Sequence, residues 1–105
     1  MNLFLQKQPL ISLDSVVVVS GELVSANLDG EVVILGFKSG SYYSLDQVGA
    51  FVWDLLQQSR KVSELRDAIL NEYDIDLEQC EQDLFHLLAE LVDKGLVDIK
   101  TDSTG

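Results

Sequence analysis

A change in the spacing of apolar residues near Asp46 constrains the fold of this chain more than any other feature. Before that point, Val16 to Val19 and Val32 to Phe37 are nearly continuous apolar runs, as in buried β-strands. After it, apolar residues recur every three or four positions, which is the period of an amphipathic helix. The order predicts an α+β fold in which strands precede helices.

Turn sequences separate the expected strands. Leu23 to Leu28 alternates loosely between apolar and small polar residues, and Asp29-Gly30 after it is a hairpin sequence. Ser39-Gly40 marks a second turn, between the strand Val32 to Phe37 and a further strand, Ser41 to Leu45. These segments together predict a three-stranded antiparallel sheet.

The strand Ser41 to Leu45 has a regular period of two. It places Tyr43 and Leu45 on one face, which we assign to the core, and Tyr42 and Ser44 on the other. If the sheet runs in chain order, this strand lies at an edge, and no proline or lysine inside it blocks its unpaired backbone groups.

Three helices are expected after the sheet. Asp46 is placed to cap the first, Gln57 to Lys61 separates it from the second, and the third begins at Asp76, which forms a variant of the capping box with Gln79. The apolar stripes of the first two helices are Val48, Phe51, Val52, Leu55 and Leu56, and then Val62, Leu65, Ile69 and Tyr73.

The end of the third helix is equally clear. Lys94 lies in its last turn, Gly95 suits the left-handed residue just past the end, and Leu96 can fold back onto the helix. Leu96 to Lys100 is then a candidate short strand. The fold class that we predict is α+β and winged-helix-like, with a three-stranded antiparallel sheet followed by three helices.

The length of the chain indicates one domain over residues 1–105. Within it, residues 1–21 are expected to form an N-terminal arm or an extra strand, and residues 101–105 a polar tail. No N-terminal segment has the pattern of a secretory signal, and no apolar run reaches the roughly 20 residues of a membrane-spanning helix. We therefore expect a cytoplasmic protein with no membrane partner.

The charge of the chain restricts its partners. Seven Lys and Arg against eighteen Asp and Glu give a formal net charge of -11, which opposes binding to nucleic acids and anionic membranes. The expected third helix is especially acidic, so a winged-helix regulator that inserts this helix into DNA is disfavoured. A neutral or cationic partner fits better.

The sequence lacks the combinations of residues that most classes of enzyme use for catalysis. His86 is the only histidine and Cys80 the only cysteine, so no multi-histidine metal site or disulfide is available. Cys80 lies in the apolar stripe of the third helix, as expected of a buried structural thiol, and His86 projects from the polar side as a solvated residue. No glycine pattern for a nucleotide is present, and we expect neither catalysis, nor a metal, nor a cofactor.

The third helix carries more apolar residues than one packing face requires. They cover an arc of about 160°, and they are Leu84, Phe85, Leu87, Leu88, Leu91 and Val92. If one flank of this arc lies beside the edge strand Ser41 to Leu45, the two form a groove for an extended peptide. The alternative is that the whole arc packs against the other helices and the sheet.

The order of several short motifs resembles the PqqD family, whose members are called RiPP recognition elements. The motifs are Gly40 to Asp46, then Gly49 and Trp53 to Leu56, then Val62 to Leu70, Tyr73-Asp74, Asp83-Leu84, Leu87-Leu88 and Gly95 to Val97. The resemblance covers about residues 22 to 98. It departs from the family at Asp46, where Asn is frequent, and at Gln58-Ser59, which replaces a common Asp-Gly loop.

The resemblance implies a function and a site. It implies a stand-alone protein that binds the leader of a ribosomally made precursor peptide as an added strand and presents it to modifying enzymes. A leader peptidase or a cyclase of a lasso-peptide pathway is the expected partner, and a structural subunit of an enzyme is the alternative. The implied peptide-binding residues are Ser41, Tyr42, Tyr43, Ser44 and Leu45 of the edge strand, with Asp83, Leu84, Leu87 and Leu88 of the third helix.

Overall fold

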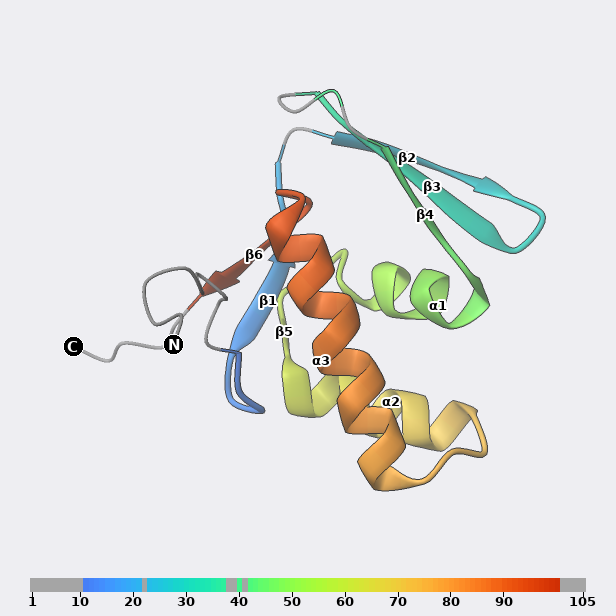
Figure 1. The fold of residues 1–105 in the computed structure, drawn as a ribbon, viewed down its shortest axis with the longest axis vertical. Coiled ribbons are helices and arrows are strands. Elements are labelled where there is room, and N and C mark those ends of the chain that lie inside the picture. The colour runs from blue at the N-terminus through green and yellow to red at the C-terminus, as the bar shows by residue number, and fades with distance from the viewer. Residues whose placement is uncertain (1–10, 22, 38–39, 41, 101–105) are drawn as a thin grey trace, which may run out of the picture.

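The computed structural model describes residues 11–21, 23–37, 40 and 42–100 of the chain. Strands occupy the first half and helices most of the second (Figure 1), so the predicted α+β class and the order of its elements are confirmed. Ser41 and the expected tail, residues 101–105, lie outside the described residues, as do residues 1–10 of the expected arm.

The predicted three-stranded sheet is formed by β2 (Leu23–Leu28), β3 (Glu31–Gly36) and β4 (Tyr42–Leu45), in chain order. Asp29 and Gly30 join β2 to β3 with φ angles of 55° and 85°, as a two-residue type I′ turn requires. One expectation is wrong at the end of β3: Phe37 lies beyond the strand and is 62% exposed.

A second small sheet was not expected as such. Its order is β5 (Arg60–Lys61), β1 (Val16–Val19) and β6 (Val97–Lys100). Here β1 is the extra strand that was one of the two alternatives for residues 1–21, and β6 is the strand expected near the end of the chain. The segment predicted only to break the first helix supplies β5, because Arg60 and Lys61 pair with the N-terminal strand.

Three helices pack beside the sheets: α1 (Gln47–Leu55), α2 (Val62–Glu72) and α3 (Leu77–Asp93). Asp46 and Asp76 cap α1 and α3 by accepting bonds from Gly49 N and Gln79 N. The capping box at Asp76 is only half formed, because the Gln79 side chain donates to Asp83 instead.

The end of α3 is a Schellman motif. Gly95 has a φ of 74°, its N–H bonds to the Val92 carbonyl, and the Leu96 N–H bonds to the Leu91 carbonyl. Leu96 is 1% exposed, so the chain turns sharply and leads into β6.

One core joins the sheets and the helices. The buried side chains come from every helix and from β1, β3, β4 and β6, and they include Val17, Ile34, Leu45, Val52, Leu65, Leu84, Leu88 and Val97. The first helix differs from its predicted stripe in two places: Val48 is 40% exposed, whereas Trp53 is buried. The Trp53 ring packs in the apolar core, with its Nε1 3.4 Å from Ser25 Oγ on β2. Among the described helices, none has the length and apolarity to span a membrane.

Candidate functional site

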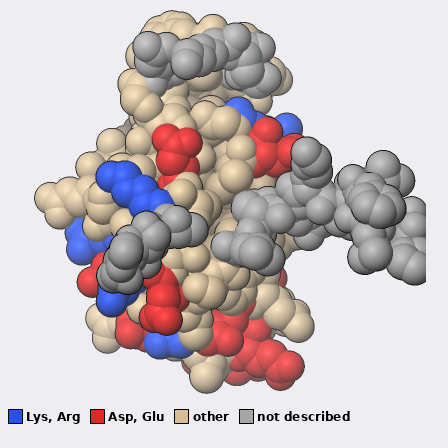
Figure 2. All heavy atoms as spheres, turned by 90° about the vertical axis from the view of Figure 1, so that its left-hand side faces the viewer, with Lys and Arg blue, Asp and Glu red and all other residues tan. Residues whose placement is uncertain are grey.

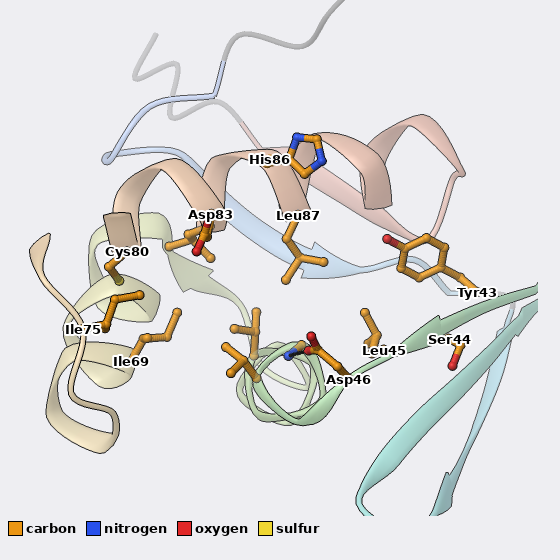
Figure 3. Close-up of a pocket in the computed structure, with 14 residues that line it drawn as sticks. Tyr43, Ser44, Leu45, Asp46, Ile69, Ile75, Cys80, Asp83, His86 and Leu87 are labelled. Carbon is orange, nitrogen blue, oxygen red and sulfur yellow. Dashed lines mark hydrogen bonds between the residues drawn. The ribbon is translucent and has the colours of Figure 1, made fainter. Parts of the chain in front are cut away.

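A cleft of about 450 Å³ opens between β4, α1 and α3. In Figure 3, Tyr43 lies at one end of this cleft and Ile69, Ile75 and Cys80 lie at the other. Its lining is mostly apolar, with a few polar groups at the rim. The residues that line it are Tyr43, Ser44, Leu45, Asp46, Val48, Gly49, Val52, Ile69, Ile75, Cys80, Asp83, Leu84, His86 and Leu87.

The strand β4 forms one wall of the cleft and is an edge of its sheet, as predicted. Its side chains alternate as expected: Leu45 is buried and Tyr43 partly buried, whereas Tyr42 and Ser44 are exposed. Tyr42 is 71% exposed and does not line the cleft.

The register of the sheet fixes which backbone groups of β4 are free. In a two-residue hairpin the flanking residues, here Leu28 and Glu31, form a hydrogen-bonded pair, and such pairs alternate along the ladder. Val32 and Ile34 therefore direct their backbone groups toward β4, where Leu45 and Tyr43 are their partners. The N–H and C=O groups of Tyr42 and Ser44 consequently point away from the sheet, along its open edge.

The junction between β4 and α1 is tight. A Cβ added at Gly49 would lie 3.0 Å from Leu45 Cδ2 and 3.1 Å from Leu45 Cβ, so a larger residue here would press against the end of the strand. The Asp46 side chain at the same junction accepts from Gly49 N at 2.9 Å. These contacts fix the angle between the strand wall and the α1 floor of the cleft.

The opposite wall is the predicted flank of α3. Leu84 and Leu87 line the cleft, and Figure 3 shows Leu87 pointing from α3 across the opening. Asp83 lies at the rim, where its Oδ1 accepts from Gln79 Nε2 at 2.8 Å. Leu88, also expected in this wall, is 0% exposed and packs in the core instead, because it lies about 100° around the helix from Leu87.

The floor of the cleft was not predicted as part of a site. Val48 and Val52 of α1, Ile69 of α2, and Ile75 between α2 and α3 all contribute. These positions belong to ordinary helical stripes, so their sequence pattern indicates burial and nothing more. Of these floor residues, only Val48 in the first turn of α1 is exposed, and an exposed apolar side chain there is consistent with an open cleft.

Cys80 closes the deep end of the cleft. It is 1% exposed, as expected of a structural thiol, and its Sγ contacts the Arg66 carbonyl oxygen at 3.9 Å. Burial raises the pKa of the Cys80 thiol. The group is therefore held in its protonated, weakly nucleophilic form.

A polar cluster ties β4 to α3 at the other end. The Tyr43 hydroxyl donates to the Glu90 carboxylate, and Lys94 Nζ lies 5.6 Å from the centre of the Tyr43 ring. The hydrogen bond to Glu90 and burial raise the pKa of Tyr43 to about 12. The sequence offered no sign of this contact, because 47 residues separate its two members.

His86 is exposed and projects from the polar side of α3, opposite the apolar stripe, as predicted. In Figure 3 it points away from the cleft, whereas Leu87 points into it. His86 belongs to the lining only at the outer edge, where its Nε2 lies 3.5 Å from Glu90 Oε2. In the part of the chain that the structure describes, no three His, Cys, Asp or Glu side chains converge as metal ligands would.

The arrangement suits an extended peptide. An open strand edge offers main-chain donors and acceptors, and the apolar cleft beside it accepts every second side chain of a strand that pairs there. Of the predicted residues, the structure brings Tyr43, Ser44, Leu45, Asp83, Leu84 and Leu87 to this cleft, with the backbone of Tyr42 at its edge.

Comparisons with known proteins agree with this geometry. The chain is 39% identical to TbiB1, solved in complex with the TbiA(beta) leader peptide; the match covers 81% of this chain and 99% of that one, with a TM-score of 0.74. A lasso peptide synthetase B1 complexed with the leader peptide shares the fold at 22% identity, with a TM-score of 0.69 over 78% of this chain and 96% of that one. A comparison with curated protein sequences finds no match. The profile of the family described as coenzyme PQQ synthesis protein D (PqqD) matches residues 31–97, and the chain belongs to this family.

Proposed function

We propose that this protein binds the leader segment of a ribosomally synthesised precursor peptide and presents it to modifying enzymes of a lasso-peptide pathway. The observation that carries the proposal is the open edge of β4 beside the apolar cleft. The relative at 39% identity over nearly its whole length was solved with a leader peptide, which supports the same class of ligand here.

The leader pairs with β4 as a fourth strand of the sheet. Its main chain bonds to the outward N–H and C=O groups of Tyr42 and Ser44, which gives affinity without regard to sequence. Alternate leader side chains enter the cleft, where Leu84 and Leu87 hold an apolar one. Specificity thus comes from the shape of the cleft, and the acidic rim at Asp83 favours a leader that carries Lys or Arg.

Recognition, and not catalysis, is the role that we assign to the chain. Cys80 is protonated and buried. Among the described residues, Glu90 carries the only carboxylate within ion-pair distance of His86. The leader peptidase or cyclase that modifies the precursor is then a separate protein. The bound leader holds the precursor in a fixed orientation for that enzyme.

Calorimetric titration of the protein with a synthetic leader tests the proposal. The first peptide tested is the TbiA(beta) leader with which the relative was solved, followed by other precursor leaders, and a scrambled peptide of the same composition is the control. Leu87→Ala should weaken binding about tenfold, because it removes apolar contact in the cleft. Leu70→Ala on α2, which removes a partly buried leucine outside the cleft, is the matched control and should bind as the wild type does. No binding of any precursor leader would favour the structural-subunit alternative.

A further inference from the structure

Main-chain pairing with β4 does not by itself fix the position of a leader along the strand. The outward N–H and C=O groups of Tyr42 and Ser44 pair with an extended segment of any sequence. A slip of one residue turns every side chain of the leader to the opposite face, so the apolar cleft disfavours it. A slip of two residues keeps the faces and loses no main-chain bond. Side chains of the cleft are therefore needed to distinguish positions two residues apart.

The Tyr43 side chain crosses from β4 to α3 at the end of the cleft where β4 begins. Its hydroxyl donates to the Glu90 carboxylate, and we call this contact the Tyr43–Glu90 bridge. Lys94, one turn further along α3, lies with its Nζ 5.6 Å from the centre of the same ring. Two side chains of α3 thus hold the ring in place, and Figure 3 shows it at this end of the cleft.

The cleft is deeper away from the bridge. Leu45, the next residue of β4 on the same face, is buried, and beyond it the cleft is lined by the buried side chains of Ile69, Cys80 and Leu84. The Glu90 side chain, by contrast, is 44% exposed, so the bridge lies close to the surface. The space open to a side chain that enters from the leader therefore differs between the two ends.

We propose that the Tyr43–Glu90 bridge sets the register of the leader, because it admits only a small side chain opposite Tyr43. In a strand that pairs with β4, the residues opposite Tyr43 and Leu45 both face the cleft. A bulky apolar side chain fits opposite Leu45 or beyond, whereas opposite Tyr43 it meets the ring that the bridge holds.

Tyr43 and Glu90 are then positioning residues, and they select a class of leader. Such a leader carries a small residue two positions away from a bulky apolar one, so that the two occupy the shallow and the deep part of the cleft. The inference rests on the proposed function, since it concerns where the bound leader lies.

Calorimetric titration with a panel of leader variants tests the proposal. Each residue of the TbiA(beta) leader is replaced in turn by Trp, and the dissociation constant of each variant is divided by that of the unmodified leader. For the wild type, this ratio should be about ten or more for the leader residue opposite Tyr43, because the held ring leaves no room for the larger side chain. For Glu90→Ala, the ratio should fall toward one at this position alone, since the ring can turn aside.

Further variants separate the bridge from a general effect on the fold. Glu90→Gln keeps an acceptor for the Tyr43 hydroxyl and should keep the wild-type ratios, whereas Tyr43→Phe removes the bond and should lower the same ratio as Glu90→Ala does. Glu81→Ala is the matched control. It also removes an α3 carboxylate that bonds to another element, Arg66 on α2 at 3.0 Å, but it lies outside the cleft and should keep the wild-type ratios.

The Glu81 control also accounts for charge, because each alanine variant loses one of eighteen carboxylates. Many of these remain, and on the face that Figure 2 shows they gather toward the lower end of the molecule, so the overall attraction of a basic leader changes little. A bridge that merely stabilises the fold would weaken all leaders alike and leave the ratios unchanged. Ratios that Glu90→Ala and Tyr43→Phe change at no position, or equally at every position, would overturn the inference while leader binding stands. A wild-type protein that binds no leader would overturn the proposed function and this inference with it.

Discussion

At the scale of single residues, Tyr43 connects the two walls of the cleft. It lies on β4, lines the cleft, and donates its hydroxyl hydrogen to Glu90 on α3. The contact sets the spacing between strand and helix at one end of the site. It also gives Tyr43 a titration behaviour that separates it from an ordinary tyrosine.

Replacing Tyr43 by Phe should remove the phenol that titrates near pH 12 and should lower the free energy of unfolding. The pKa of Tyr43 is raised to about 12 in the folded protein, above its ordinary value of 10.0. The stabilisation from this shift is fully present below the unfolded pKa and is lost as pH rises through the folded pKa, so it disappears between about pH 10 and 12. Ultraviolet absorbance titration should show one phenol fewer near pH 12 in the variant. Urea unfolding at neutral pH should show a loss of about 1 kcal/mol.

Asp83 is the candidate contact for a basic leader side chain. Asp83→Asn should weaken the binding of a leader that carries Lys or Arg a few-fold at low salt, because exposed ion pairs contribute about 0.2 to 1 kcal/mol to binding. At high salt the two proteins should bind alike. Its present bond from Gln79 can persist in the variant. Calorimetry at both salt concentrations checks this, and equal affinities at low salt would mean that Asp83 is merely solvated.

Residues whose role depends on local backbone geometry could be predicted from the sequence. Asp46 and Asp76 cap their helices and Gly95 ends α3, because these roles need only a few neighbouring residues. Leu88, by contrast, was expected in the wall of the cleft, whereas the structure buries it in the core. Which edge of the apolar arc faces the cleft depends on how α3 is rotated against α1 and β4, and the periodicity of α3 does not determine that rotation.

At the scale of elements, the proposed leader binding depends most on the strand β4. Its edge position was predicted from chain order and is confirmed by the topology. Its outward groups follow from the two-residue turn between β2 and β3 and from the register of the sheet. A backbone change at an outward position should therefore affect binding more than folding.

Ser44→Pro should weaken leader binding by more than Ser44→Ala does, because proline removes the outward N–H and alanine keeps it. The fold should survive both changes, since this N–H does not bond to β3. Calorimetry gives the two affinities, and circular dichroism confirms the fold. Matching affinities for the proline and alanine variants would show that the peptide does not pair with β4 at this position.

Gly95→Ala tests the end of α3. The variant should lose about 1 kcal/mol of stability in urea unfolding, because alanine is strained at a φ of 74°. Nothing lies within 4 Å of the added Cβ, so strain is the sole expected cost. An unchanged midpoint would mean that the last turn relaxes without loss.

At the scale of the whole molecule, sequence reasoning predicted the class of fold and the three helices but not the second sheet. That sheet joins β1, β5 and β6, which lie far apart in the chain, and β5 has only two residues. The floor of the cleft was missed for the same reason, since Val48, Ile69 and Ile75 come together only when three helices pack. Pairing over long distances leaves no local pattern in the sequence.

Amide hydrogen exchange measured by NMR, with and without the leader peptide, tests the central claim most directly. A leader that adds to β4 should slow exchange at Ser44, whose N–H otherwise faces the open edge, and should shift the resonances of Leu84 and Leu87 across the cleft. The amide of Tyr43, already directed toward β3, should change little in comparison. Binding that leaves exchange at Ser44 unaltered, or that shifts resonances only outside the cleft, would contradict the account.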